Sequence, residues 1–207
     1  MDTAKYHYLA WKRLANSLSF DFSEVHNEQL KGVSRMRSLD IILQLGNVEL
    51  SEEEKLRLAA EKNQWYLEYI LQMDESEILP GVTDFLEELR RKDVRVALGS
   101  ASKNAQTILD RIHLSSSFDV IVDGNMVEKA KPDPEVFIKG AELMRLESHQ
   151  CIVFEDAQAG VAAALNAGMY CVGIGEEDVL GNAHIVIPGF QGIHFTEIED
   201  KLKEKGL

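Results

Sequence analysis

One stretch near the C-terminal end, residues 151–168, constrains the fold of this chain more than any other. The apolar run Cys151-Ile-Val-Phe154 is short and rich in β-formers, and it predicts a buried strand. Glu155 and Asp156 follow directly, and a helix is then expected to Ala167, with Gly168 at its C-terminal cap. In open parallel sheets, ligands bind at the carboxyl ends of strands. Two acids there suit Mg²⁺, although the pair taken alone is better explained as a solvated loop, so the other strands decide the question.

Composition limits the classes of function. The chain has 207 residues, 45% of them hydrophobic, which is enough for one large domain or two modest ones. Its net charge of -13 argues against nucleic acid or an anionic membrane as the main partner. A small anionic substrate remains possible, because a metal ion and a few local cations can reverse the local field.

Cysteine usage and hydropathy indicate the compartment. Cys151 and Cys171 lie in apolar runs, so we expect buried thiols and no disulfide, as in a reducing cytoplasm. We find no signal peptide, no apolar run of membrane-spanning length and no internal repeat. We therefore expect a cytoplasmic protein, and a monomer.

Residues 3–75 predict helices joined by loops, with no strand. Expected helices cover residues 4–18, 24–31, 35–45 and 51–73, the last opened by a capping box of Ser51 and Glu54. A single antiparallel helical bundle accounts for them. His7 and Trp11 lie one turn apart on the apolar face of the first helix, where ordinary core packing is the plainer explanation for both.

The pattern changes at Leu79-Pro80-Gly81. From there strands alternate with helices, and Asp133 and Pro134 are expected at the start of one helix. Expected strands cover residues 94–98, 118–122, 151–154, 170–174 and 184–187. This alternation predicts an α/β fold, a Rossmann-like parallel sheet with right-handed crossovers. We therefore predict two domains: a helical module over residues 3–75, and an α/β core over residues 79–207 that also includes residues 1–2.

Three segments bring polar groups to the strand ends. Ser100 offers a hydroxyl and nearby backbone N–H groups for phosphate oxygens. Lys131 offers a cation that can neutralise charge on a transferring phosphoryl group, and Glu155 with Asp156 offers the metal site. Each signal alone is weak, but together they predict Mg²⁺-dependent phosphoryl transfer.

At this point a family resemblance is clear. Ser100, Lys131-Pro132-Asp133-Pro134 and Glu155-Asp156-Ala-Gln-Ala-Gly160 resemble the second, third and fourth motifs of the haloacid dehalogenase superfamily. The inserted helical module resembles the small α-helical cap of that superfamily. Further stretches resemble the branch that interconverts β-glucose 1-phosphate and glucose 6-phosphate: residues 2–11, 27–35, 100–104 and 177–181.

The resemblance implies roles for individual residues. Ser100 and Lys131 would hold the transferring phosphoryl group, and His7 would lie near the catalytic loop and hinge. Arg35 would hold the phosphate that is not transferred. The implied substrate-binding residues are Trp11, Gly32, Ser34, Arg35, Ser38, Ser102, Lys103 and Asn104. Glu155 and Asp156 would bind Mg²⁺, while Ala157 stands where relatives often have serine.

The first family motif, Asp-x-Asp-Gly, is absent from the sequence. In the family its first Asp is the nucleophile and its second the general acid and base. It should lie just upstream of the residue that matches Met1; Asp2 matches a later family residue, and Asp123-Gly124 belongs to another strand end. The sheet should therefore lack its central strand and leave two edges unpaired. We favour a chain that starts inside a longer protein, the alternative being a short protein that has lost catalysis, and we expect little or no mutase activity from this chain.

Three functions remain to be separated. The first is mutase chemistry, favoured by the second phosphate site that the Gly32–Arg35 loop implies. The second is a sugar-phosphate phosphatase on the same scaffold, with water as the acceptor. The third is a non-catalytic sugar-phosphate-binding protein.

Overall fold

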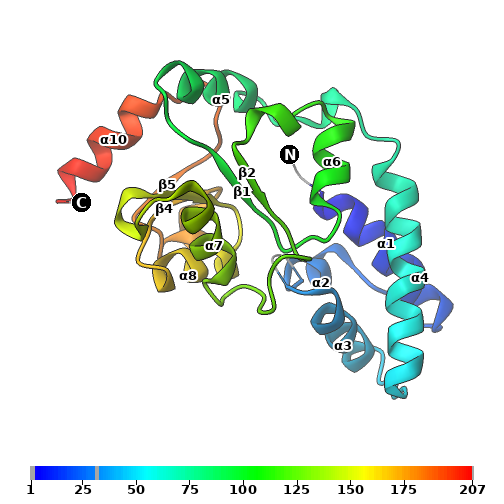
Figure 1. The fold of residues 1–207 in the computed structure, drawn as a ribbon. Coiled ribbons are helices and arrows are strands. Elements are labelled where there is room, and N and C mark those ends of the chain that lie inside the picture. The colour runs from blue at the N-terminus through cyan, green and yellow to red at the C-terminus, as the bar shows by residue number, and fades with distance from the viewer. Residues whose placement is uncertain (1–2, 31–32, 207) are drawn as a thin grey trace.

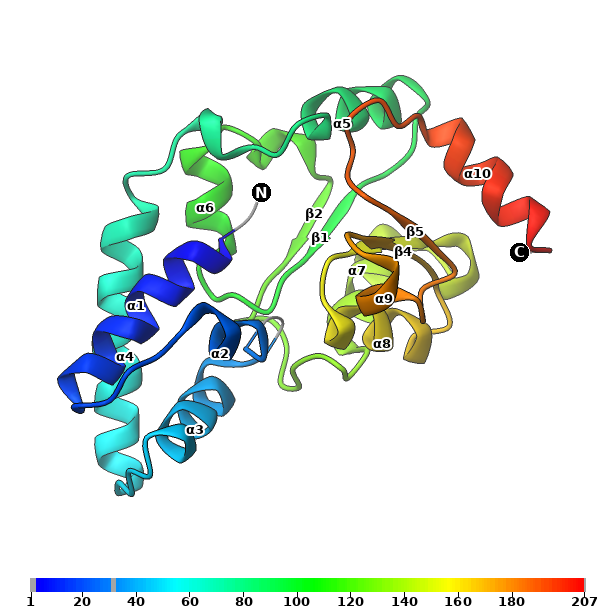
Figure 2. The same cartoon turned by 180° about the vertical axis from the view of Figure 1, so that it is seen from behind.

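The structure is a computed structural model that describes residues 3–30 and 33–206. Helices make up its N-terminal part, and parallel strands with flanking helices make up the rest (Figures 1 and 2). No helix in these ranges is long and apolar enough to cross a membrane. Both cysteines are free thiols, as expected, and Cys171 is buried.

The N-terminal part contains four helices, and no strand is found among its described residues. They are α1 (Ala4–Ser17), α2 (Glu24–Glu28), α3 (Arg35–Leu45) and α4 (Glu52–Ile70). Helix α1 lies along α4, and α3 packs against α4 nearer its N-terminal end (Figure 1). Apolar residues one helical turn apart form their common core, including Trp11, Leu14, Leu39, Ile42 and Leu58.

Helix α4 starts and ends for identifiable reasons. The Ser51 side chain accepts a hydrogen bond from the Glu54 N–H, and the Glu54 carboxylate accepts one from the Ser51 N–H, which confirms the predicted capping box. The helix ends at Ile70, three residues before the expected end at Met73. Met73 is nevertheless buried, at 1% exposure, so its apolar side chain reported burial and not helical backbone.

Residues 75–206 supply five strands and the remaining helices. They are η1 (Glu75–Glu77), α5 (Val82–Arg91), β1 (Ala97–Gly99), α6 (Ala105–Arg111), η2 (Ser115–Ser117), β2 (Val120–Val122), α7 (Glu135–Met144), η3 (Ser148–Gln150), β3 (Ile152–Glu155), α8 (Gln158–Asn166), β4 (Tyr170–Ile174), α9 (Glu177–Leu180), β5 (Ile185–Ile187) and α10 (Phe195–Glu204). All strand pairs are parallel, which confirms the α/β fold. Gly168 has φ +69° just after α8, as expected of a residue beyond a helix C-cap.

The strands form two sheets instead of one. One sheet has the order β1–β2 and the other β3–β4–β5, and no strand of the described chain joins β1 to β3. Figure 1 shows the two groups of strands apart, with α5 near the ends of both. The split agrees with the expectation that the sheet lacks a strand. Side chains connect the two parts instead, because Phe85 and Phe195 pack with Val96 of one part and Phe154 of the other.

Three local predictions were wrong. The first strand begins at Ala97 and not at Val94, because the Val96 N–H donates to the Asp119 side chain and not to a neighbouring strand. The N-cap of α7 is Pro134 and not Asp133, although the Asp133 carboxylate still accepts a hydrogen bond from the Glu135 N–H at 3.1 Å. Helices α9 and α10 were not predicted.

An apolar interface joins the helical part to the α/β part. Ala10, Tyr66, Ile70 and Met73 of the first share one buried cluster with Ile108, Leu109, Ile112 and Leu114 of the second. One hydrogen bond crosses the same boundary, from the Asn104 side-chain amide to Asn63 Oδ1 of α4, at 3.0 Å. The loop that follows β1 is thus held directly against α4.

Candidate functional site

The loop after β1 is a compact turn built by serine hydroxyls. The Ser102 N–H donates to Ser100 Oγ, and the Asn104 N–H donates to Ser102 Oγ, each at 3.1 Å. Gly124, after β2, lies so close that an added Cβ would be 2.5 Å from the Ala101 carbonyl oxygen. In both bonds the hydroxyl acts as acceptor, so the Ser100 proton remains available for a phosphate oxygen.

Lys131 and Glu155 form a buried ion pair between the two sheets. Only 7% of the lysine side chain and 9% of the glutamate side chain are exposed. Lys131 Nζ also donates to the Gly99 carbonyl at the end of β1, at 3.2 Å, and lies 4.7 Å from the centre of the Phe137 ring. Burial raises the pKa of Glu155, and the charge and hydrogen bond of Lys131 partly offset that rise.

Gly160 makes room for the Glu155 carboxylate. A Cβ added at Gly160 would lie 2.1 Å from the carboxyl carbon of Glu155, far inside van der Waals contact. The first turn of α8 therefore packs directly on the acid. This gives a physical reason for glycine at the end of the Glu155–Gly160 stretch.

The adjacent acids fit a magnesium ion only in part. Glu155 is buried at 8% exposure, and Asp156 is exposed. Across residues 3–30 and 33–206, no group of three or more His, Cys, Asp or Glu residues could hold a metal ion. Two carboxylates match the chemistry of Mg²⁺, which keeps several waters and binds few protein ligands. The residues fit an ion that takes its remaining ligands from water and from a phosphate.

A second cluster lies in the helical part, around Lys62 of α4. This side chain is buried at 1% exposure, and its Nζ lies 2.9 Å from His7 Nδ1 of α1. It also lies 4.3 Å from the centre of the Trp11 ring and 4.8 Å from that of Tyr66. The rings of His7 and Tyr66 are stacked, with centroids 4.1 Å apart. Lysine, imidazole and two aromatic rings thus form one packed unit.

This cluster is positively charged and lacks an acid. No carboxylate pairs with Lys62 in the described part of the chain, and the Arg35 charge acts on both Lys62 and His7. Burial, followed by the charge of Arg35, lowers the pKa of Lys62 well below its usual value. Burial, followed by the charges of Lys62 and Arg35, lowers the pKa of His7. The arrangement suits an anionic ligand.

The two clusters meet at the loop after β1. Asn104 is hydrogen-bonded to Asn63, the neighbour of Lys62 in sequence. Burial raises the pKa of Tyr66 to about 12, and Ser102 lies close enough to its hydroxyl to offset part of that shift without making a hydrogen bond of normal geometry. Ser102 and Asn104 therefore lie at the junction of the helical and α/β parts.

The other predicted site residues differ in their surroundings. Ser34 is the N-cap of α3 and accepts a hydrogen bond from the Arg37 N–H, Ser38 is buried at 3% exposure, and Lys103 is exposed. Gly32 lies outside the described residues. The structure brings together His7, Trp11 and Arg35, and separately Lys131 and Glu155.

Sequence analysis missed Lys62. Leu56 was placed on the buried face of its helix, yet that side chain is 61% exposed. The buried residues of α4 are Leu58, Ala59, Lys62, Tyr66 and Ile70, at the spacing of one helical face. A lysine in a buried register was the available signal, because lysine is almost never fully buried without a partner.

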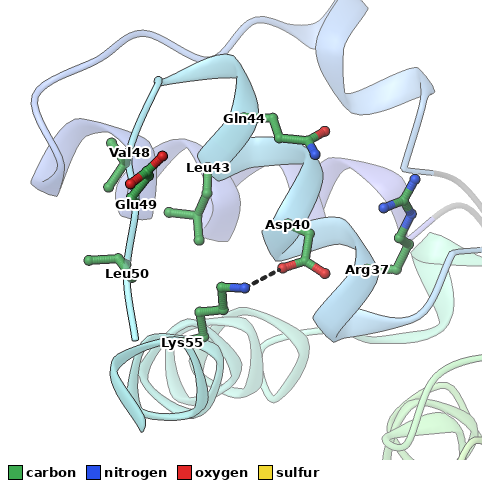
Figure 3. A pocket seen from close by; sticks show the side chains of 8 residues that line it. All are labelled: Arg37, Asp40, Leu43, Gln44, Val48, Glu49, Leu50 and Lys55. Carbon is green, nitrogen blue, oxygen red and sulfur yellow. Dashed lines mark ion pairs between the residues drawn. The ribbon is translucent and has the colours of Figure 1, made fainter. Parts of the chain in front are cut away.

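Two surface hollows lie away from both clusters. Figure 3 shows the first, of about 480 Å³, between α3, the segment that follows it and α4, with Lys55 paired to Asp40 at 3.1 Å. The second, of about 500 Å³, lies around Leu79, Pro80 and His113. Neither contains a predicted site residue.

Comparison with known proteins places the chain in a family. Residues 1–174 match the family described as haloacid dehalogenase-like hydrolase. The chain is 37% identical over 188 residues to a β-phosphoglucomutase of Bacillus subtilis, covering 90% of this chain and 83% of that protein. It is 30% identical over 172 residues to a phosphorylated carbohydrates phosphatase of Thermotoga maritima, covering 82% and 77% of the two chains.

A solved structure gives the same result. The crystal structure of a β-phosphoglucomutase from Clostridium difficile superposes with a TM-score of 0.94 at 40% identity, and the match covers 99% of this chain and 92% of that one. The resemblance to the haloacid dehalogenase superfamily is thereby confirmed. This chain belongs to the haloacid dehalogenase-like hydrolase family.

Proposed function

We propose that this chain carries the binding sites of a β-phosphoglucomutase, which interconverts β-glucose 1-phosphate and glucose 6-phosphate with Mg²⁺. The main observation is that two cationic sites meet at one loop: Lys131 beside Ser100 in the α/β part, and Arg35 with Lys62 in the helical part. A mutase needs two such sites, because its substrate carries a phosphate at either end during the reaction. The similarity to two β-phosphoglucomutases supports the proposal.

The helical module over residues 3–75 is proposed as a cap, and residues 79–207 with residues 1–2 as the core. In the core, the Lys131 ammonium and the Ser100 hydroxyl would hold the transferring phosphoryl group. When bound, Mg²⁺ would supply positive charge against the phosphoryl oxygens, held by Glu155 and Asp156. The ion pair of Lys131 with Glu155 fixes the lysine before any ligand arrives.

In the cap, Arg35 is proposed to hold the phosphate that is not transferred. The fork of a guanidinium matches phosphate oxygens, and Arg35 is only partly exposed. Ser102 and Asn104, at the junction, would contact the sugar. His7 would orient Lys62 through the 2.9 Å contact between Nδ1 and Nζ.

Turnover by this chain is expected to be very low. The family resemblance assigns the phosphoryl acceptor to an Asp-x-Asp-Gly motif, which the 207-residue sequence does not contain. Substrate binding does not require that motif. We therefore propose that the chain binds sugar phosphates and shows little or no mutase activity.

The rival function is a sugar-phosphate phosphatase. The similarity to the carbohydrate phosphatase of Thermotoga maritima favours it. A phosphatase needs only the core site, because water replaces the second sugar oxygen as acceptor. The contribution of Arg35 therefore separates the two functions.

The test measures binding of glucose 6-phosphate by calorimetry, with Arg37→Ala as the matched control for Arg35→Ala. Losing a charge-assisted contact should weaken binding by about 10- to 100-fold for Arg35→Ala. Arg37 lines the outer hollow of Figure 3, so Arg37→Ala should bind normally. Unchanged affinity in Arg35→Ala would overturn the mutase proposal and favour a phosphatase.

Assays with Mg²⁺ complete the test. Phosphorus NMR of β-glucose 1-phosphate distinguishes conversion to glucose 6-phosphate from release of inorganic phosphate. We expect neither at a substantial rate. Rapid phosphate release would establish a phosphatase, rapid isomerisation would refute the expected loss of turnover, and binding without turnover fits the non-catalytic alternative.

A further inference from the structure

Lys62 is an enclosed lysine with no acid beside it. Its side chain is 1% exposed, and Nζ contacts an imidazole nitrogen, His7 Nδ1, at 2.9 Å. The faces of Trp11 and Tyr66 occupy the neighbouring directions. Water and carboxylate, the usual surroundings of an ammonium group, are replaced by three rings.

The groups that face Lys62 come from three helices and are all neutral or cationic. His7 lies on α1, Arg35 on α3, and Tyr66 one turn along α4 from Lys62 itself. Burial holds the Tyr66 hydroxyl neutral by raising its pKa to about 12, and burial together with two cations holds the imidazole neutral. Arg35 remains charged, because a guanidinium does not lose its proton in proteins.

A second full positive charge is unfavourable in this setting. An enclosed ammonium beside an arginine, with no anion, gives up its proton to water more readily than an exposed one. A phosphate dianion next to Arg35 reverses the balance, because it supplies the missing negative charge within the same cluster.

We propose that the Lys62–His7 pair takes up one proton from solvent when a phosphate-bearing substrate binds beside Arg35. This inference rests on the proposed function, since it assumes the cap phosphate site. The proton adds to the lone pair of the Lys62 amine, and no other bond forms or breaks. Lys62 then donates one N–H to His7 Nδ1 and has further N–H groups for the ligand. The site thus acquires its second charge only with a dianion, which selects phosphorylated sugars over neutral ones.

The experiment is calorimetry of glucose 6-phosphate binding to the 207-residue chain between pH 7.5 and 9.5. Each titration is repeated in two buffers of different ionisation enthalpy, which counts protons taken up. The second pKa of a phosphate monoester is about 6, so the ligand itself does not titrate in this range. We expect an uptake of up to one proton per ligand, and a Kd that rises with pH by up to about tenfold per unit.

Variants assign the proton to a residue. Lys62→Met should abolish the uptake and weaken binding. Lys62→Arg should abolish the uptake while retaining a charge, because the guanidinium is protonated throughout. Lys55→Met is the matched control on the same helix: Lys55 is paired with Asp40 in the outer hollow, so the uptake should persist.

Three results would contradict the inference. Binding with no proton uptake and a constant Kd would overturn it and leave the proposed function intact. Uptake that persists in Lys62→Met would overturn the assignment to Lys62. Absence of binding to the unchanged chain at every pH would overturn the proposed function, and this inference with it.

Discussion

The two buried lysines of this chain have opposite surroundings. Lys131, in the α/β part, is paired with Glu155 and also donates to a backbone carbonyl. Lys62, in the helical part, contacts an imidazole and two aromatic rings and has no acid within the described residues. One site is neutralised from within, and the other is not.

The difference separates two ways of preparing a site for phosphate. The Lys131–Glu155 pair fixes geometry in advance, since a buried pair with satisfied hydrogen bonds holds both side chains. The Lys62 cluster leaves charge unbalanced, which costs folding stability but favours an anion. On a chain with net charge -13, such a local cationic cluster is the more notable feature.

Breaking the paired site should have the largest effect. Glu155→Leu leaves Lys131 buried without a partner and should lower the free energy of unfolding by about 3–5 kcal/mol. The double variant Lys131→Met with Glu155→Leu should recover much of that loss, because apolar replacements of both partners are often neutral. Urea unfolding measures all three. A control, Lys129→Ala, removes an exposed pair with Asp133 and should cost about 0–1 kcal/mol.

A loss below 1 kcal/mol in Glu155→Leu would show that the pair does not organise the core. A double variant no more stable than Glu155→Leu would show that packing, and not charge, causes the loss.

Crowding the same site should have the next largest effect. A Cβ at Gly160 would overlap the Glu155 carboxylate, so Gly160→Ala should cost about 1–3 kcal/mol through overpacking. Gly189→Ala is the matched control, since nothing lies within 4 Å of the added Cβ and its φ is not positive. Thermal unfolding of the two variants measures the difference. Equal stability would contradict the described packing of α8 on the acid.

Removing the unpaired lysine should have the opposite sign. Lys62→Met keeps the shape of the side chain and deletes a poorly compensated cation, so it should raise the free energy of unfolding at pH 7 by about 1 kcal/mol. Because the pKa of Lys62 is lower in the folded state, the unfolded chain binds more protons, and the stability of the unchanged protein should rise with pH up to about 10.4.

The advantage of Lys62→Met should therefore shrink between pH 7 and pH 10. Urea unfolding at both pH values measures it. A variant less stable than the unchanged chain at pH 7 would show that Lys62 stabilises the fold and is not held at a cost.

The smallest effect is expected at the start of α4. Ser51→Ala removes the capping box and should cost about 0.5 kcal/mol, at the low end for caps because the site is exposed. Ser51→Gly should cost only a few tenths. Hydrogen exchange should show the loss as fraying of the first turn of α4. Protection that changes in β3 instead would mean that the helical and α/β parts unfold together.

Much of the fold could be predicted because local signals agreed with the tertiary structure. Tyr170–Ile174 was predicted at both ends, since its apolar run is bounded by Gly168 and Gly175. Helix α10 was not predicted, although Phe195, Ile198 and Leu202 form a buried stripe. The short β1 could not be placed by pattern, because its extent depends on pairing with β2.

The site was predictable where chemistry follows a strand and unpredictable where it depends on packing between helices. Glu155 and Lys131 come directly from motifs. The contact of Lys62 with His7 joins residues far apart in sequence, and only the packing of α1 on α4 brings them together. No local pattern reveals that a lysine in a buried register lacks an acid.

The most direct test of the central claim is an NMR titration of the lysine side chains, labelled with ¹³C at Cε, with Lys62→Met used to assign the resonance. The account predicts that Lys62 titrates well below the value of about 10.4 typical of exposed lysines, and that saturating glucose 6-phosphate moves its pKa upward. If Lys62 instead titrates with the exposed lysines, and the sugar phosphate leaves its pKa unchanged, the helical part does not hold an unbalanced cationic site for the substrate.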